Sequence, residues 1–203
     1  KKIQTKKSVV QNSLFRVSIY ILKRKLYLYN YIYVMLRKNM TSTRTEIVFK
    51  QKFLGTEFTF HSTWGLFSPK QVDLGSALLI KNIVAPPNAD CLDLGCGYGP
   101  IGIALARLCP HGKIHMIDKD FVAVEYAKKN IALNRFTNCA VYLSNGFYQI
   151  PPPQRFDLIA SNLPAKVGNE LLTIFLNEAH NRLKKGGKIY VVTIAGLKNY
   201  IKR

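Results

Sequence analysis

From residue 90 onward, short apolar runs alternate with longer segments whose apolar residues have helical spacing, and this alternation constrains the fold most strongly. The spacing predicts helices over 100–109, 121–134 and 168–187, the last ending at Gly186. The apolar runs predict five strands, at 90–94, 113–118, 139–144, 156–161 and 188–195. Strands joined through helices form βαβ units. The sequence therefore predicts a Rossmann-like, doubly wound α/β fold of three layers, with a mainly parallel sheet between two helical layers.

The segment ahead of these units has a different pattern. "TEIVFKQKFLGTEFTFHSTWGLFS", residues 45–68, contains period-two stretches of β-branched and aromatic residues around Gly55. This pattern predicts one or two strands. Asp73 then stands ahead of a short apolar helix expected over 77–83, which "APPNAD" ends.

The positive charge is unevenly distributed along the chain. Of 30 basic residues, ten lie in residues 1–39, which hold no acid, and the remainder keeps 20 basic against 11 acidic residues. This smaller surplus still suits a polyanionic partner such as nucleic acid.

Residues 1–39 form a basic N-terminal extension that includes an apolar, aromatic stretch. Lys23, Arg24 and Lys25 interrupt that stretch, and the remaining "LYLYNYIYVML" is too short to cross a bilayer. We expect the extension to be disordered or not native, with the natural start at Met35 or Met40 and one domain over 40–203. The alternative is a basic amphipathic arm for RNA or a membrane surface.

The four cysteines, Cys91, Cys96, Cys109 and Cys139, have no CxxC spacing, and no histidine cluster accompanies them. This usage is typical of free thiols in a cytoplasmic protein and predicts neither a metal site nor a disulfide.

The loop "DLGCGYGPIG", residues 93–102, joins the first predicted strand to the helix after it. Its glycines allow a tight turn and a close approach of backbone to a ligand. Asp118 ends the second strand, where an acid can bind both hydroxyls of a ribose. The spacing also satisfies the dinucleotide pattern GxGxxG, so the loop alone leaves a nicotinamide oxidoreductase open.

The charges around this loop favour a cationic ligand. Asp93 precedes the glycines, where it would repel a pyrophosphate and attract the sulfonium and ammonium of S-adenosylmethionine. We therefore expect S-adenosylmethionine as the cofactor.

With "SNLPAK" at the end of the fourth strand and "LFSPKQVDLGSALLI" upstream, the chain resembles the class I S-adenosylmethionine-dependent methyltransferases. The resemblance covers roughly Phe60 to Ala195. The upstream stretch limits the resemblance to the small-domain group, which includes the ribosomal RNA guanine-N2 methyltransferases of the small subunit. Family members usually add a terminal antiparallel pair of strands, which this chain is expected to lack as a C-terminally truncated domain.

The resemblance also implies which residues hold the cofactor. Asp118 would bind the ribose, Asp93 would lie near the methionine end, and Asn145 stands where the family usually has an acid for the adenine amino group. The segment from Phe67 to Ser76 would close over the methionine portion. The implied cofactor residues are Phe67, Ser68, Asp73, Gly75, Ser76, Asp93, Gly95, Cys96, Gly97, Gly99, Asp118, Lys119, Asn145, Gly146 and Asn162.

Methyl transfer to a planar amino group needs acceptors, because the nitrogen lone pair is delocalised. The Asn162 side chain and the Leu163 carbonyl can accept the two amino hydrogens, and Pro164 restricts Leu163 to extended geometry. These three residues are the predicted catalytic set, and such catalysis is largely positioning. Ala165 replaces the aromatic residue that family members use to stack on the base. Tyr98, Phe147 and Tyr148 are other aromatic residues that could stack on it.

The sequence thus predicts an N-methyltransferase acting on a guanine amino group of small-subunit ribosomal RNA. Its expected partners are ribosomal RNA or the small subunit, without a membrane. The alternatives are a protein-glutamine methyltransferase and a non-catalytic S-adenosylmethionine-binding module.

Overall fold

The structure is a computed structural model that describes residues 45–163 and 169–193. The expectations for residues 1–39 and for Pro164 and Ala165 lie outside these residues. The description below concerns the compact unit that begins at Glu46.

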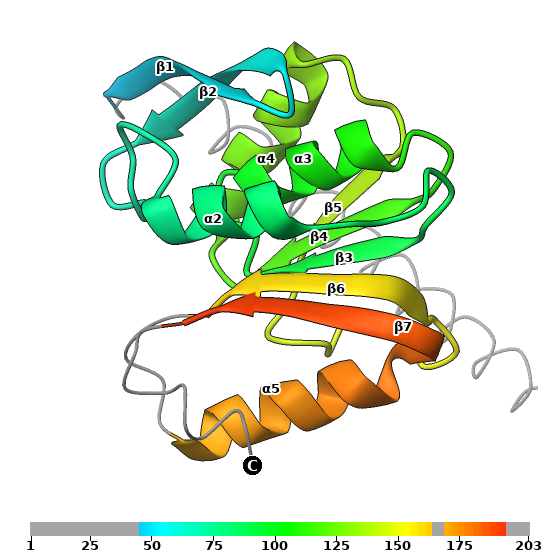
Figure 1. Ribbon diagram of the computed structural model, residues 1–203. Coiled ribbons are helices and arrows are strands. Elements are labelled where there is room, and N and C mark those ends of the chain that lie inside the picture. The colour runs from blue at the N-terminus through cyan, green and yellow to red at the C-terminus, as the bar shows by residue number, and fades with distance from the viewer. Residues whose placement is uncertain (1–44, 164–168, 194–203) are drawn as a thin grey trace, which may run out of the picture. The chain divides into compact units, whose positions relative to one another are not determined.

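A five-stranded sheet in the order β5-β4-β3-β6-β7 forms the centre of this unit (Figure 1). Every neighbouring pair within it is parallel. The strands are β3 (Cys91–Leu94), β4 (Ile114–Asp118), β5 (Cys139–Leu143), β6 (Phe156–Asn162) and β7 (Leu183–Val192). β3 is buried along its whole length, as expected for a central parallel strand covered on both faces. The predicted parallel sheet is confirmed.

Helices cover both faces of the sheet, which confirms the three predicted layers (Figure 1). α2 (Leu74–Asn82), α3 (Pro100–Leu108) and α4 (Phe121–Leu133) lie on one face, and α5 (Asn169–Asn181) lies on the other. The larger hydrophobic core packs under the first three helices, and a smaller one, which includes Phe156 and Ala179, lies under α5.

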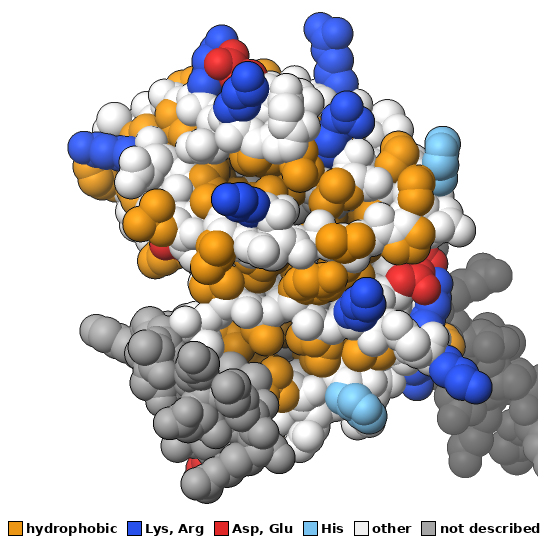
Figure 2. All heavy atoms as spheres, viewed as in Figure 1, with side chains coloured by type: hydrophobic (Ala, Val, Ile, Leu, Met, Phe, Trp, Pro, Cys, Tyr) orange, Lys and Arg blue, Asp and Glu red, His pale blue; other side chains and the backbone are white. Residues whose placement is uncertain are grey.

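α2 begins at Leu74, three residues before the predicted start. The Asp73 side chain caps it by accepting a hydrogen bond from the Ser76 N–H at 3.0 Å. The helix is apolar on both sides. Leu79 and Ile80 are buried, whereas Leu74 and Leu78 are exposed. Figure 2 shows that hydrophobic side chains are numerous on this face of the molecule. Its position therefore depends on the cap and on two inward residues.

The predicted strands at 45–68 are an antiparallel hairpin of β1 (Glu46–Phe53) and β2 (Thr56–Thr63). Its two-residue turn, Leu54-Gly55, has positive φ at both positions, as a tight hairpin turn requires.

The hairpin docks on α4 through two asparagines one turn apart. The Asn130 side chain accepts from the His61 N–H at 2.7 Å and donates to the carbonyls of His61 and Tyr98. The Asn134 side chain makes the matching pair of bonds with the Thr59 backbone. Two side-chain amides thus replace a neighbouring strand at the edge of β2.

The prediction of a helix to Gly186 is wrong. α5 ends at Asn181, and Leu183 instead pairs with Phe156 at the start of β7. The register then shifts, so that Lys188 pairs with Leu158, and Gly186 takes up the irregularity with φ 79°. Pairing with β6 overrides the helical spacing of residues 183–186.

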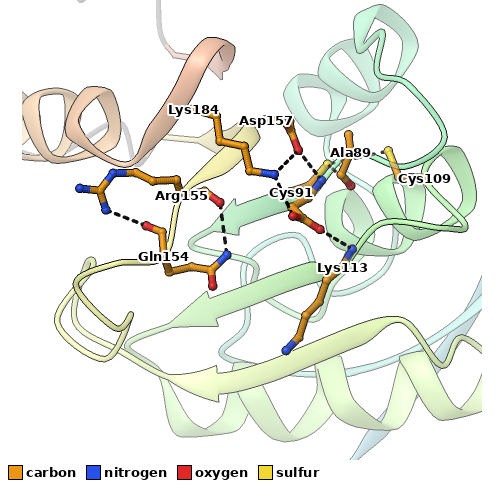
Figure 3. Close-up of polar contacts among 9 residues, drawn as sticks. Ala89, Cys91, Cys109, Lys113, Gln154, Arg155, Asp157 and Lys184 are labelled. Atoms are coloured by element: carbon orange, nitrogen blue, oxygen red, sulfur yellow. Dashed lines mark hydrogen bonds and ion pairs between the residues drawn. The ribbon is translucent and has the colours of Figure 1, made fainter.

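At the amino ends of the strands, Lys184 joins two carboxylates (Figure 3). Its Nζ lies 2.9 Å from Asp90 Oδ2 and 2.8 Å from Asp157 Oδ2. The Asp157 carboxylate also accepts from the Asp90 N–H. The cluster links the start of β7 to the starts of β3 and β6, at the edge of the sheet away from the glycine loop.

All four cysteines are free, and three of them are buried. Among the described residues, no helix has both the length and the apolar character that a membrane span requires.

Candidate functional site

A cavity of about 570 Å³ lies at the carboxyl ends of the strands. Open parallel sheets bind ligands at this edge, and the volume is in the range of small-molecule sites. The cavity brings together most of the predicted site residues from five separate segments. Those that line it are Phe67, Ser68, Asp73, Gly75, Ser76, Gly95, Cys96, Gly97, Asp118, Lys119, Asn145, Gly146, Asn162 and Leu163.

The glycine loop presents bare backbone to this cavity. Gly95 and Gly97 have φ of 74° and 56°, and a Cβ added to either would meet no atom within 4 Å. A ligand can therefore approach the main chain closely at these two positions.

Gly99 differs from the other two glycines. It takes φ 101° at the N-cap of α3, and an added Cβ would lie 2.9 Å from Met116 Cε. It does not line the cavity. Its conformation allows α3 to pack closely on β4, so contact with a ligand is not its evident role.

Asp118 ends β4 beside the glycine loop and is hydrogen-bonded to it. Its Oδ2 accepts from the Gly97 N–H at 2.9 Å, and its Oδ1 accepts from the Asp120 N–H at 2.9 Å. Each carboxylate oxygen has a further lone pair. The carboxylate is therefore held in place, lines the cavity and retains further acceptor capacity.

Asp93 lies behind the loop and is completely buried. Its Oδ2 accepts from the Gly102 N–H at 2.7 Å, and its Oδ1 has no hydrogen-bond partner among the described residues. Burial, with a smaller contribution from the charge of Asp118, raises the pKa of Asp93 to about 8. Asp93 does not line the cavity, so its carboxyl can influence a ligand only through its charge.

Phe67 and Ser68 form another part of the cavity wall. Ser68 holds φ 47°, an uncommon conformation for a residue with a side chain, and its hydroxyl donates to the Gln71 carbonyl at 2.7 Å. The Tyr98 hydroxyl lies 3.1 Å from the Ser68 carbonyl and 3.0 Å from that of Gln71. Tyr98, which belongs to the glycine loop, thus ties this wall to the loop.

Asn162 ends β6 at the edge of the cavity. Its Nδ2 donates to Asp73 Oδ2 at 2.7 Å and to Ser76 Oγ at 3.0 Å. The next residue, Leu163, is buried, and its N–H donates to the Val192 carbonyl at 2.9 Å. The main chain of β6 therefore stays paired with β7 as far as Leu163.

Several lining residues were not predicted. They include Leu171 and Phe175 of α5, as well as Val192 and Thr193 at the end of β7. The spacing of Leu171 and Phe175 indicated only a buried helical stripe. Phe175 comes close to the loop after β5 because Gly146 has no side chain. An added Cβ would lie 3.0 Å from Phe175 Cε1.

The aromatic residues that could stack on a base differ in their exposure to solvent. Tyr98 and Phe147 are buried, and Tyr98 packs edge-on against Phe49 and Phe60. Tyr98 lines the cavity, whereas Phe147 does not. Tyr148 is 85% exposed, and Phe67 is 72% exposed while lining the cavity.

Within residues 45–163 and 169–193, no group of His, Cys, Asp or Glu side chains could hold a metal ion.

A parallel sheet with helices on both faces, a glycine loop after its first strand and an acid at the end of the next define the nucleotide-binding class of Rossmann-like proteins. Within that class, residues 57–200 match the family model of the methyltransferase small domain. The chain belongs to this family.

Two relatives illustrate the similarity. The chain is 39% identical over 137 residues to the uncharacterized protein YbxB of Bacillus subtilis (strain 168), covering 67% of this chain and 68% of the relative. It is 36% identical over 137 residues to the ribosomal RNA small subunit methyltransferase C of Hamiltonella defensa, covering 66% and 40%. The chain therefore spans less than half of the length of that methyltransferase.

A solved structure shares the fold. The T. thermophilus 16S rRNA N2 G1207 methyltransferase (RsmC), in complex with AdoMet and guanosine, matches with a TM-score of 0.66 and 29% identity. The match covers 75% of this chain and 43% of that one.

The site fits S-adenosylmethionine on its own geometry. Gly95 and Gly97 leave room at the main chain, and Asp118 keeps free lone pairs suited to ribose hydroxyls. The unpartnered Asp93 Oδ1, buried behind the loop, is a site where negative charge can develop when a cation lies nearby.

Proposed function

We propose that the chain is an S-adenosylmethionine-dependent N-methyltransferase that acts on a guanine exocyclic amino group of small-subunit ribosomal RNA. The proposal includes ribosomal RNA or the small subunit as partner and the cytoplasm as location. Membership of the methyltransferase small domain family and the similarity to the ribosomal RNA methyltransferases support it.

One observation carries the chemistry. Both hydrogens of the Asn162 amide are engaged by Asp73 and Ser76, so its Oδ1 is the polar atom left to face the cavity. A carbonyl oxygen there can accept a hydrogen from an amino group and orient the nitrogen lone pair.

We assign the proposed roles mainly to residues that line the cavity. Asp118 holds the ribose of the cofactor, and the glycine loop and Asn145 border its nucleoside. Asn162 and the Leu163 carbonyl hold the target amino group, with Pro164 as the third member of the proposed catalytic set. S-adenosylmethionine supplies a methyl group on a positively charged sulfur, so the protein's contribution is orientation and exclusion of water.

Transfer of a labelled methyl group tests the proposal. Purified small subunits, naked ribosomal RNA and release factors serve as alternative acceptors, with S-adenosylmethionine binding measured separately by calorimetry. We expect transfer to ribosomal RNA or the subunit. Asn162→Ala should reduce this transfer at least about a hundredfold while changing cofactor affinity little, as expected for an orienting residue.

Transfer to release factors alone would instead support the protein-glutamine methyltransferase. Cofactor binding without transfer to any acceptor would support the non-catalytic module.

A further inference from the structure

We propose that Asp73 and Ser76 are positioning residues that fix the orientation of the Asn162 amide, and that binding the cofactor is not their main role. This inference rests on the proposed function, because it assigns these two residues to the acceptor that holds the target amino group. It also changes the role that the family resemblance implied for them.

The hydrogen bonds define which way the amide faces. A carboxylate only accepts, so the atom of Asn162 that lies 2.7 Å from Asp73 Oδ2 has to be the nitrogen. The second amide hydrogen goes to Ser76 Oγ at 3.0 Å. A flipped amide would bring Oδ1 against the carboxylate oxygen, which is repulsive and leaves no donor between them.

The orientation decides what the cavity offers to a substrate. With the nitrogen held by Asp73 and Ser76, Oδ1 is the atom of Asn162 that can accept from a ligand. With the amide reversed, its NH₂ would face the target NH₂, and two donors cannot form a hydrogen bond. Reversal of this one side chain therefore removes the acceptor without moving the main chain.

The start of α2 is built to hold this contact. Asp73 Oδ2 also accepts from the Ser76 N–H, so the cap of the helix and the hold on Asn162 share one oxygen. The Ser76 side chain is buried, which keeps its hydroxyl in place.

Gly75, one of the two residues between Asp73 and Ser76, allows the close approach of α2 to the sheet. A Cβ added at Gly75 would lie 2.7 Å from Val192 Cγ1, 3.0 Å from Asp73 Oδ2 and 3.6 Å from Asn162 Nδ2. Only glycine lets the first turn of α2 sit against the ends of β6 and β7. The three neighbouring residues 73, 75 and 76 thus serve one contact with Asn162.

Asp73→Ser tests the inference in the full chain. Serine retains an N-cap acceptor for α2 but is too short to hold Asn162 in the same way. We expect the single-turnover rate of methyl transfer to fall about 10- to 100-fold, in line with loss of orientation, while the dissociation constant for S-adenosylmethionine changes less than about threefold.

Asp120→Ser is the matched control. Asp120 is likewise the N-cap residue of a helix, with its side chain accepting from the Val122 N–H at the start of α4, and it does not line the cavity. We expect it to retain the transfer rate. A loss of cofactor affinity in Asp73→Ser as large as the loss of rate would make Asp73 a cofactor ligand and overturn the inference.

A second measurement does not depend on activity. The side-chain amide signals of Asn162, assigned by their loss in Asn162→Ala, are followed by ¹⁵N NMR without cofactor. In the unchanged protein we expect two well-separated hydrogens that exchange slowly with water. Asp73→Ser should shift both signals and speed their exchange, and Asp120→Ser should leave them in place.

Unchanged Asn162 signals in Asp73→Ser would overturn the inference even if transfer is lost. If the signals respond as expected but no RNA is methylated by the unchanged protein, the positioning contact stands and the proposed function fails.

Discussion

The Asp118 carboxylate accepts a hydrogen bond from the Gly97 N–H across 2.9 Å. This bond joins the acid at the end of β4 to the middle of the glycine loop. The two elements that the proposed cofactor would touch are therefore held next to each other. A change at Asp118 should therefore affect both a ligand contact and the shape of the loop.

Asp118→Ala is expected to weaken S-adenosylmethionine binding by about 100-fold or more. Hydrogen bonds to a charged group contribute about 1.5–3 kcal/mol each, and the variant loses those to the ribose as well as the hold on Gly97. Calorimetry measures the affinity, and Asp120→Ala serves as a neighbouring control that removes only the cap of α4. Equal affinities in the unchanged protein and Asp118→Ala would remove the ribose assignment.

Cofactor binding is expected to release up to about one proton at pH 7. Burial raises the pKa of Asp93 to about 8, so its carboxyl is mostly protonated at pH 7, and a cation nearby favours the ionised form. Calorimetry in two buffers of different ionisation enthalpy counts the protons. Asp93→Asn should abolish the release, and a release that persists in this variant would show that another group supplies the proton.

The same carboxyl should affect stability in the absence of ligand. Between its ordinary pKa of 3.8 and the folded value of about 8, the folded protein keeps a proton that the unfolded chain has lost. Its contribution is therefore greatest at acid pH and decreases as the pH rises through this range. Denaturation by urea at several pH values should show a flatter profile for Asp93→Asn.

Asn130→Ala is expected to lower the free energy of unfolding by about 2–4 kcal/mol. The fully buried amide makes three hydrogen bonds, and its loss leaves the His61 backbone and the Tyr98 carbonyl without these partners. Asn134→Ala, at a partly buried position, should have a smaller effect. Equal effects of the two variants in urea denaturation would contradict this account of how the hairpin docks.

The sequence predicted those parts of the site that are formed by residues close together in the sequence. The glycine loop and Asp118 follow predicted strands directly, and the hydrophobic spacing was sufficient to identify α3 and α4. The end of α5 was missed because residues 183–186 have helical spacing but pair with β6 in the fold. The hydrogen bond between Asp73 and Asn162 joins positions 89 residues apart, so no local pattern could indicate it.

The position of Asp93 has a similar explanation. Its place before the glycines predicted proximity to the ligand, but strand side chains alternate between faces, and this one points to the start of α3. Leu171 and Phe175 had the spacing of core residues. Only the packing of α5 against the sheet brings them to the cavity.

Lys184→Met is expected to lower the stability by about 0.5–1 kcal/mol at pH 7, because exposed ion pairs are weakened by solvent. Burial acts to raise the pKa of Asp90, but the hydrogen bonds from Lys184 and the Lys113 N–H outweigh it and lower the pKa below 3.8. The contribution is present above that pH and is lost as the pH falls through the lowered value. The two proteins should therefore converge in acid.

The exposed neighbour Lys185 provides the control for this change. Lys185→Met should alter the free energy of unfolding by less than about 0.5 kcal/mol at either pH. A constant difference between Lys184→Met and the unchanged protein down to acid pH would mean that lost packing, and not charge, explains the effect.

The Tyr98 hydroxyl lies within hydrogen-bonding distance of the carbonyls of both Ser68 and Gln71, and this has a consequence for ligand binding. The segment that carries Ser68 is therefore held against the glycine loop by contacts within the protein. A ligand that enters does not have to assemble its own enclosure, so little ordering entropy opposes binding.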